Sequence, residues 1–219
     1  MLKDFLNRLL WLGHSTFVYT GPPVVYFNPY DIHRIQPADL ILVGHEHRHH
    51  CSPPDLERVR KSATIVIADQ SAARKIDPPV IAMSPGEELT TSHGVTIEAV
   101  PAYNLETSYH PKSKGYLGFI ATLAGVRVYH AGDTDFIPEM RRLKVDIALL
   151  PVSGLEVMTA EEAARAALAL KPQVAIPMHY GPADPEIRPP QGVTEPSVEA
   201  EAFRALLAGK IRVEILARS

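Results

Sequence analysis

The sequence predicts an α/β fold, arranged as an αββα sandwich of two mixed β-sheets flanked by helices. Two observations support this prediction. Short apolar runs, typical of buried strands, recur along the chain, and helical segments follow the strands in each half. In addition, no linker or low-complexity segment divides the sequence, so residues 1–219 are predicted to form a single domain.

The N-terminal part of the chain is predicted to be dominated by strands. Segments rich in β-branched and aromatic residues indicate strands at residues 9–12, 16–19, 24–27, 39–43, 64–68, 80–83 and 95–100. Helices are expected at residues 53–61 and 71–76. Ser52 is suited to cap the first of these helices, with Pro53 at its first position and Asp55 in its first turn.

The C-terminal part alternates between strands and helices. It begins with a predicted hairpin, whose strands at residues 116–123 and 126–130 turn at Ala124-Gly125. Beyond the hairpin we expect strands at residues 146–151, 174–178 and 211–216 and helices at residues 159–170 and 196–207. Thr159 and Glu162 have the spacing of a capping box.

The polar segment that precedes the hairpin, residues 101–114, has no periodicity and is predicted to be a loop. A loop of this length within a compact domain is often functional. We therefore treat its polar side chains as candidates for a binding or catalytic site.

The composition is that of a globular protein, with 46% hydrophobic and 21% charged residues. A net charge of −3 gives no basic surface for nucleic acid, and no apolar run is long enough to span a membrane. Cys51 is the only cysteine, and we expect a small buried thiol there. With no disulfide and no signal-peptide pattern, the protein is expected to be cytoplasmic. The expected partner is a small-molecule substrate; the oligomeric state is open, a homo-oligomer included.

Four histidines fall within six residues, at positions 45, 47, 49 and 50, although the whole chain has only ten. They follow the apolar run at residues 39–43, and ligand sites in α/β folds collect at the carboxyl ends of strands. His45 and His47 share a face of an extended chain, and His50 follows through the turn. Imidazole is a common ligand for zinc, so the cluster predicts a metal site. The alternative is a solvated histidine-rich loop.

Two further polar residues are placed in the same way. Asp133 follows the second strand of the hairpin, and His179 follows the strand at residues 174–178. Taken singly, Asp133 could cap a turn and His179 could be a half-buried structural histidine. Together with the histidine cluster they suit a hydrolytic metal centre, in which histidines hold the metal and a carboxylate can bridge two ions. Bound metal lowers the pKa of water to about 7.

Five segments of the chain resemble the metallo-β-lactamase superfamily. In chain order they are WLGHS at 11–15, FNP at 27–29, GHEHRHH at 44–50, YHAGDTD at 129–135 and IPMHYG at 176–181. They follow the order of the family and extend over most of the chain. Within the superfamily, the chain is most similar to the short, stand-alone hydrolases of the ascorbate-6-phosphate lactonase and N-acyl-phosphatidylethanolamine phospholipase D groups.

The resemblance implies an αββα sandwich with a site for one or two divalent metals at the sheet edges. Carried over by position, it implies that His45 and His47 bind the first metal, that His50 and His179 bind the second, and that Asp133 bridges them. Zinc is the expected metal, with manganese and iron as alternatives.

The third ligand of the first site has two candidates. In related proteins it follows the end of a Pro-rich strand, where this chain has Asn104, which is a poor zinc ligand. His110 lies in the same loop and is the preferred candidate. The alternative for His110 is a histidine on the loop surface.

Two positions depart from the family pattern, and both lose a carboxylate. His49 stands at the aspartate of the H-x-H-x-D-H motif, which in the family binds the second metal and orients the attacking water. Asn28 stands in the Asp-Pro element. Two divalent ions, less Asp133 and one hydroxide, leave a net charge of roughly +2. That charge weakens the second metal site and favours an anionic substrate.

The expected function is that of a metal-dependent hydrolase, in which metal-bound hydroxide attacks an ester, lactone or phosphodiester of a small, anionic substrate. Asp133, His49 and His14 are the expected catalytic residues. His14 belongs to the Gly-His-Ser element near the family's active site, where it could hydrogen-bond substrate or pack behind the sheet. β-Lactams are not expected substrates. The alternative, based on His49 and Asn28, is a catalytically weak metal- or ligand-binding protein with a degenerate site.

Overall fold

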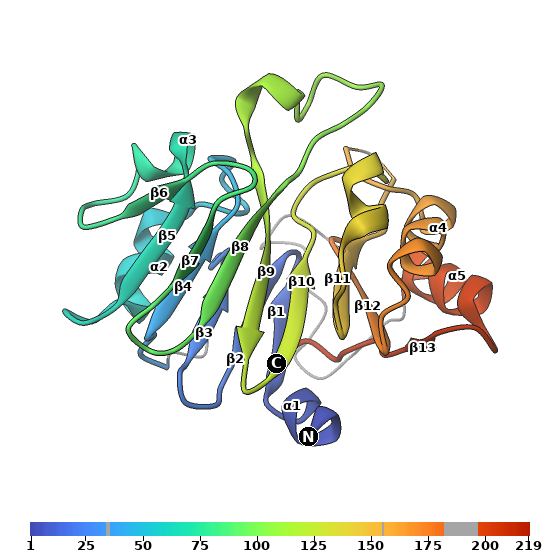
Figure 1. Cartoon of the computed structure of the whole chain (residues 1–219), viewed down its shortest axis with the longest axis horizontal. Helices are drawn as coiled ribbons and strands as arrows, with labels where there is room; N and C mark the ends of the chain where they lie inside the picture. Colours follow the sequence, from blue (N-terminus) through green and yellow to red (C-terminus); the bar gives the residue numbers. More distant parts are fainter. Residues whose placement is uncertain (34–35, 155, 182–196) are drawn as a thin grey trace.

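The computed structural model describes residues 1–33, 36–154, 156–181 and 197–219. Two mixed β-sheets face each other, and helices flank them at both sides (Figure 1). The predicted αββα sandwich is therefore confirmed. The expected start of the last helix at Pro196 lies outside the described residues.

The N-terminal part of the chain forms the first sheet. Its strands in spatial order are β1 (Leu9–Gly13), β2 (Thr16–Tyr19), β3 (Val25–Phe27), β4 (Leu40–Val43), β5 (Ile65–Asp69) and β6 (Ile81–Met83). β1 to β3 are antiparallel, whereas β3 to β6 run parallel. In β4, Leu40 and Leu42 belong to the core between the sheets, whereas Ile41 and Val43 pack with residues of the helix α2 (Pro53–Val59). Because both faces of β4 are buried, its sequence is a continuous apolar run.

The second sheet contains the rest of the strands. In spatial order they are β13 (Arg212–Val213), β12 (Val174–Met178), β11 (Ile147–Pro151), β10 (Val126–His130), β9 (Leu117–Leu123), β8 (Thr96–Pro101) and β7 (Glu88–Thr90). β7 to β10 are antiparallel and β10 to β13 are parallel. Helices α4 (Ala160–Leu170) and α5 (Val198–Leu207) pack against each other and bury side chains in the same core.

The predicted hairpin is confirmed as β9 and β10. Its turn residues Ala124 and Gly125 both have positive φ values, of 49° and 77°. Two successive residues with positive φ fit the type I′ turn, whose twist matches that of the flanking strands. From this turn β10 runs to His130, shortly before Asp133.

Two predicted helix caps differ from the structure. Ser52 does not cap α2 through its side chain; its hydroxyl donates to Asp55 Oδ2 at 2.7 Å. The Asp55 carboxylate also accepts hydrogen bonds from the backbone of residues 31 and 32, so it holds the preceding loop. Thr159 caps α4 as predicted, accepting from the Glu162 backbone. The Glu162 carboxylate, however, accepts from the Phe136 backbone, so half of the predicted capping box is absent.

Several short elements escaped prediction or are shorter than expected. Helix α1 (Leu2–Leu6), strand β7 and the 3-10 helices η1 (Lys112–Lys114) and η2 (Pro138–Arg142) were not predicted. Helix α3 covers Gln70–Ala73 rather than residues 71–76. The closing strand β13 has two residues, because beyond it the chain leaves the second sheet and Arg218 pairs with Trp11 of the first.

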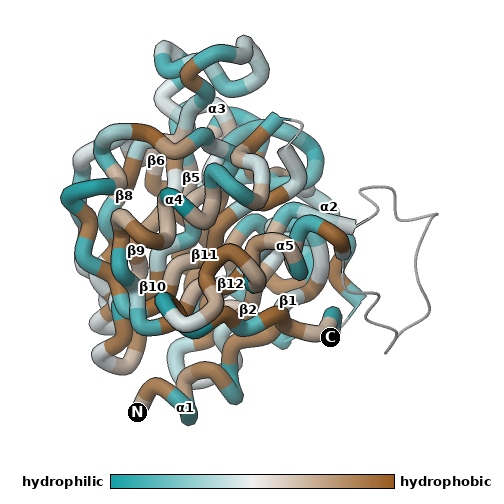
Figure 2. The backbone as a smooth tube through the Cα atoms, turned by 90° about the vertical axis from the view of Figure 1, so that its right-hand side faces the viewer, coloured by the Kyte–Doolittle hydropathy of each residue, from teal (hydrophilic) through white to brown (hydrophobic). Residues whose placement is uncertain are grey.

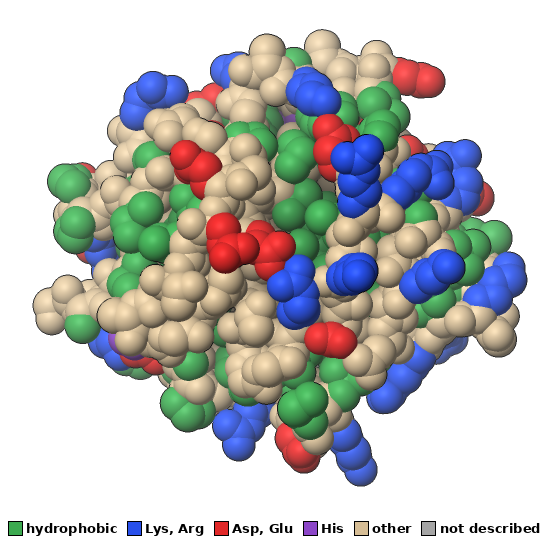
Figure 3. All heavy atoms as spheres, viewed as in Figure 1, with side chains coloured by type: hydrophobic (Ala, Val, Ile, Leu, Met, Phe, Trp, Pro, Cys, Tyr) green, Lys and Arg blue, Asp and Glu red, His purple; other side chains and the backbone are tan. Residues whose placement is uncertain are grey.

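Apolar and polar residues are distributed as expected for the globular protein that the composition predicts. Figure 2 shows apolar positions concentrated in the strands and hydrophilic positions in the connecting segments. On the face drawn in Figure 3, basic and acidic side chains both occur and little histidine surface is visible. Within the described ranges, no helix has the length and apolar character needed to cross a membrane.

His130, at the end of β10, links the two sheets. Its Nε2–H donates to the carbonyl oxygen of Ser15 at 2.9 Å, and its Nδ1 accepts from the Gly132 backbone at 3.2 Å. The ring is 1% exposed and lies parallel to Phe27. Burial lowers the pKa of His130 to about 4. The neutral ring therefore makes both hydrogen bonds. A proton added to Nδ1 would break the bond from Gly132 and place a charge in the buried core.

We expect His130 to make the folded state sensitive to acid. Between pH 6.5 and 4 the unfolded chain binds a proton at this histidine and the folded chain does not, so stability is lost as the pH falls. The contribution is about 2 kcal/mol between pH 7 and pH 5. The free energy of unfolding is measured in urea between pH 7 and pH 5. His130→Gln is expected to reduce its change with pH by this amount, whereas His93→Gln, at an exposed histidine, is expected to keep the wild-type change. Equal slopes for wild type and His130→Gln would contradict this assignment.

Candidate metal centre

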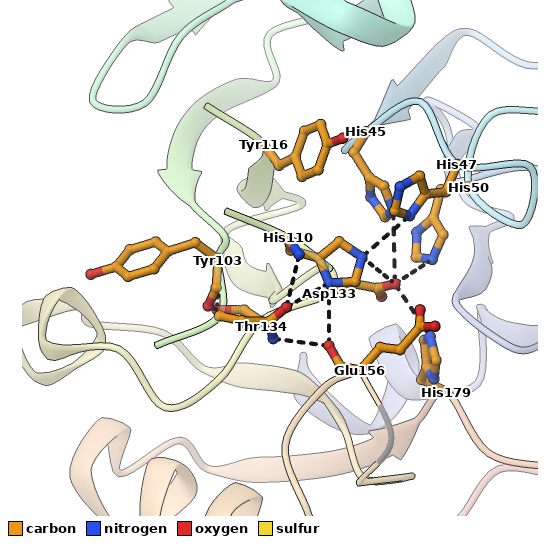
Figure 4. A network of polar contacts seen from close by, with 12 residues as sticks. His45, His47, His50, Tyr103, His110, Tyr116, Asp133, Thr134, Glu156 and His179 are labelled. Carbon is orange, nitrogen blue, oxygen red and sulfur yellow. Dashed lines mark hydrogen bonds and ion pairs between the residues drawn. The ribbon is translucent and has the colours of Figure 1, made fainter. Parts of the chain in front are cut away.

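The polar side chains predicted from the sequence meet at one end of the sandwich. β4 of the first sheet leads into His45, His47 and His50, whereas β10 and β12 of the second sheet lead into Asp133 and His179 (Figure 4). The loop between β8 and β9 brings in His110, and the turn between β1 and β2 brings in His14. The cluster is thus shared by both sheets.

Four histidines surround one oxygen of Asp133. The Nε2 atoms lie 3.1 Å (His50), 3.3 Å (His179), 3.5 Å (His110) and 3.7 Å (His45) from Asp133 Oδ2. All except His179 are 0% to 4% exposed, as is Asp133 itself, and His179 is 13% exposed. A carboxylate in this position can share a bound ion with any of these four histidines.

Three sets of side chains have the spacing of metal ligands. They are His45 with His47 and His110; His45 with His50 and Asp133; and His14 with His50 and His179. Within each set, the candidate ligand atoms all lie within 4.8 Å of one another. Metal–nitrogen bonds of about 2.0–2.1 Å place the ligand atoms of one ion at comparable separations. The geometry therefore accommodates a metal in either half of the cluster.

The hydrogen bonding of the cluster is incomplete in a way that suits metal binding. Among the described residues, seven buried side-chain polar atoms have no hydrogen-bond partner, and five of them belong here. These are His14 Nδ1, His45 Nε2, both ring nitrogens of His50, and Asp133 Oδ1. An unsatisfied buried polar atom costs about 1–3 kcal/mol. Coordination of divalent ions would use one nitrogen of each ring and the Asp133 carboxylate, so the residues present fit the metal that the sequence predicts.

The protonation states of the cluster also favour ligation. Burial opposes the charge on Asp133, but the positive charges of His179 and His50 outweigh it and hold the pKa of Asp133 well below its usual range. Burial lowers the pKa of His45 well below its usual value, and it also lowers that of His110. An ionised carboxylate and neutral imidazoles are the forms that bind metal. His179 differs, because Asp133 outweighs the effect of burial and raises the pKa of its ring, so a metal bound there would displace a proton.

The hydrogen bonds of His110 and Asn104 favour His110 as the candidate ligand. Both amide hydrogens of Asn104 are donated, to Asp135 Oδ1 at 2.8 Å and to the carbonyl oxygen of Glu156 at 2.9 Å. Its Oδ1 therefore faces His110 Nδ1, at 3.0 Å, and the Glu156 carbonyl oxygen lies 3.2 Å from the same nitrogen. Two acceptors at Nδ1 require the hydrogen there, which leaves the lone pair on Nε2, toward the cluster. His110 thus points into the centre, and Asn104 orients it.

His179 is oriented in a similar way. Ser153 Oγ lies 3.0 Å from its Nδ1, and its Nε2 faces Asp133. The backbone N–H of His179 donates to the carbonyl oxygen of His14 at 3.0 Å, which ties the end of β12 to the turn after β1. A partner on the far ring nitrogen commonly fixes the tautomer of a metal-binding histidine.

The two sheets approach each other closely beside the metal centre, next to His45. The Leu117 backbone N–H at the start of β9 donates to the Gly44 carbonyl oxygen at 2.9 Å, and a Cβ atom on Gly44 would collide with the carbonyl oxygen of Leu117. Asn28 Oδ1 accepts from the Gly44 N–H at 2.8 Å. Asn28 therefore positions the strand end that carries His45. A neutral amide is sufficient for that role.

The remaining predicted positions lie at the edge of the cluster. His49 belongs to none of the three ligand sets among the described residues; its ring packs edge-on against Tyr30, with centroids 5.0 Å apart. His14 does belong to one set, and its ring centroid lies 4.0 Å from that of His179. Cys51 is the buried thiol that we predicted, and burial raises its pKa to about 11, so it stays protonated.

Glu156 is a polar residue of the centre that the sequence did not indicate. Its carboxylate is directed toward the cluster in Figure 4, and its charge acts on both His47 and His179. It lies in an irregular segment between β11 and α4, without a motif or a strand end beside it. A single-sequence reading has no signal for such a residue, since only the folded chain brings it to the site.

The comparisons with known proteins agree with this geometry. The model of the beta-lactamase superfamily domain matches residues 8–179. The UPF0173 metal-dependent hydrolase of Thermococcus kodakarensis is 32% identical over 227 residues, covering 95% of this chain and 96% of that protein. These relatives do not confirm the expected likeness to ascorbate-6-phosphate lactonases.

Solved structures show the same architecture. A protein from Parabacteroides distasonis described as a metal-dependent hydrolase superposes with a TM-score of 0.81 and 31% identity, covering 96% of this chain and 92% of that one. The metallo hydrolase Igni18 of Ignicoccus hospitalis superposes with a TM-score of 0.73 and 24% identity, covering 96% and 95%. With the family match and the fold in agreement, the chain belongs to the beta-lactamase superfamily and has the metallo-β-lactamase fold.

Proposed function

We propose that this protein is a metal-dependent hydrolase that cleaves an ester, lactone or phosphodiester bond in a small, anionic molecule. The observation that carries the proposal is the convergence of buried, unpartnered histidine nitrogens on the ionised Asp133. Relatives that match almost the whole chain are named metal-dependent hydrolases, which supports the same class of activity.

The proposed first metal site consists of His45, His47 and His110, and the second includes His50 and His179, with Asp133 between them. Zinc is the preferred ion because imidazole nitrogens dominate the ligand set, and manganese and iron are the alternatives. Asn104 and Ser153 orient two of these histidines through their far nitrogens.

The chemistry then follows from the charges of the centre. When bound, divalent metal supplies hydroxide at neutral pH and stabilises the negative charge that develops on the substrate. Asp133 stays ionised and offsets part of the positive charge. Glu156, whose carboxylate is directed toward the cluster, is placed to take the proton released from water and give it to the leaving oxygen.

The alternative of a degenerate binding site loses part of its support. It rested on the replacement of two family carboxylates, at His49 and Asn28. Asn28 is engaged with the Gly44 backbone, and Glu156 brings a carboxylate to the centre from another segment. The arrangement of the centre therefore favours a working hydrolase.

An assay panel tests the proposal. The purified protein is supplied with zinc, manganese or iron and offered bis-(p-nitrophenyl) phosphate, simple lactones, thioesters and a chromogenic cephalosporin. We expect hydrolysis of a phosphodiester or lactone but not of the cephalosporin, with loss on chelation and recovery with one of the metals. Activity that survives chelation would contradict the mechanism, and inactivity with every metal would favour the binding-protein alternative.

The orientation of His110 by Asn104 gives a separate prediction. Asn104→Ala removes the nearer of the two acceptors at His110 Nδ1 and leaves only the Glu156 carbonyl oxygen, so the ring is held less firmly. We expect metal affinity to fall about 10–100-fold, measured by competition with a chelating dye. The exposed Asn7→Ala serves as the control. Unchanged affinity in Asn104→Ala would show that His110 does not depend on this hydrogen bond.

A further inference from the structure

We propose that His14 is a ligand of the second metal and takes the place of the carboxylate that His49 replaces. The inference rests on the proposed function for the presence of metal at the centre. His14, His50 and His179 each offer a ring nitrogen, and these three nitrogens lie within 4.8 Å of one another. The family motif assigns this role to position 49, directly before His50, whereas the geometry points to His14, 35 residues earlier in the chain.

The ring of His14 has a nitrogen available for this role. His14 Nδ1 is buried and has no hydrogen-bond partner, as is true of both ring nitrogens of His50. The ring centroids of His14 and His179 are 4.0 Å apart, and those of His14 and His50 are 5.5 Å apart. A substrate-binding role alone would not require three imidazoles to crowd together inside the protein. A shared ion explains both their spacing and their unused lone pairs.

The backbone holds His14 in an unfavourable conformation at this position. Its φ is 48°, in the left-handed region that non-glycine residues rarely adopt, and the preceding Gly13 has φ 114°. The carbonyl oxygen of His14 accepts from Trp11 Nε1 at 2.9 Å and from the His179 backbone at 3.0 Å. The turn is therefore anchored to both sheets. Such strain persists where the surroundings fix it, often at functional sites.

His49 is less well placed for the same role. Its ring packs against Tyr30, and it is partly exposed. Its ring centroid is 5.1 Å from that of His14, but none of the ligand sets among the described residues includes it. His14, in the turn between β1 and β2, thus compensates for the loss of the family aspartate. His49, which occupies the position of that aspartate, does not.

Metal counting with matched variants tests the inference. Wild type, His14→Asn and His49→Asn are titrated with Zn²⁺ and with Co²⁺, and bound ions are counted by native mass spectrometry and elemental analysis. Asn is chosen because it tolerates the left-handed conformation and is a poor zinc ligand. We expect two ions in wild type and in His49→Asn but one in His14→Asn. The Co²⁺ absorption spectrum of His14→Asn is expected to lose the second-site component.

The outcomes separate the two proposals. Two ions in His14→Asn, or a lost ion in His49→Asn but not in His14→Asn, would overturn the role of His14 and leave the hydrolase intact. One ion in wild type would also overturn it. A wild type that binds no ion would contradict the proposed function itself. Should His14→Asn fail to fold, judged by circular dichroism, His14→Gly is counted in its place, because glycine adopts positive φ freely.

Discussion

Replacing Asp133 by Asn is expected to abolish hydrolysis and to reduce the metal content of the protein. Asp133 Oδ2 lies within 3.1–3.7 Å of four histidine nitrogens, so one neutral substitution removes the only negative charge that all of them share. Loss of several kcal/mol of charge stabilisation corresponds to a rate reduction of roughly a thousand-fold or more. Initial rates and elemental analysis measure the two effects on the same sample.

Asp77→Asn is the matched control, because Asp77 is an exposed aspartate outside the cluster. It is expected to keep both wild-type activity and metal content. Thermal unfolding of the metal-free proteins verifies that Asp133→Asn is folded. A folded Asp133→Asn with wild-type rate would show that the reaction does not use this centre.

Glu156→Gln is expected to slow the reaction without removing metal. Gln keeps the size and polarity of the side chain but cannot give a proton, so the step that protonates the leaving oxygen loses its donor. General acid–base catalysis contributes about 10²–10⁴-fold, and we expect kcat to fall in that range.

The comparison variant is Glu161→Gln, at an exposed position in the first turn of α4. It is expected to behave as wild type in rate, pH profile and metal content. Were Glu156→Gln to lose an ion, Glu156 would be a metal ligand instead of the proton donor. A wild-type kcat in Glu156→Gln would exclude both roles.

Elements buried on both faces were the most predictable from the sequence. β4, β11 and β12 are fully buried, and their apolar runs gave their positions closely. β7 was missed because it is a three-residue edge strand with only its central residue partly buried. The α2 cap was misjudged because Asp55 binds a loop from far along the chain, which no local pattern reveals.

The site was predictable where its residues follow strands and not where tertiary packing delivers them. His45, His47 and His50 are adjacent in sequence, so their clustering was visible at once. The choice of His110 over Asn104 required the hydrogen bonds of both side chains. Glu156 and the position of His14 beside His179 depend on segments that are distant in sequence. Only the fold reveals them.

Because the proposed ligands come from both sheets, bound metal would act as a cross-link between the two halves of the sandwich. An ion that binds only the folded state adds RT ln(1 + [L]/Kd) to the free energy of unfolding, about 4 kcal/mol at a thousand-fold excess over Kd. The melting temperature of this protein would then report the free metal concentration around it. In a metal-starved cell, the metal-free protein would be less stable than the metal-bound protein, so it would unfold and be degraded faster. The supply of metal would then set the amount of enzyme as well as its activity.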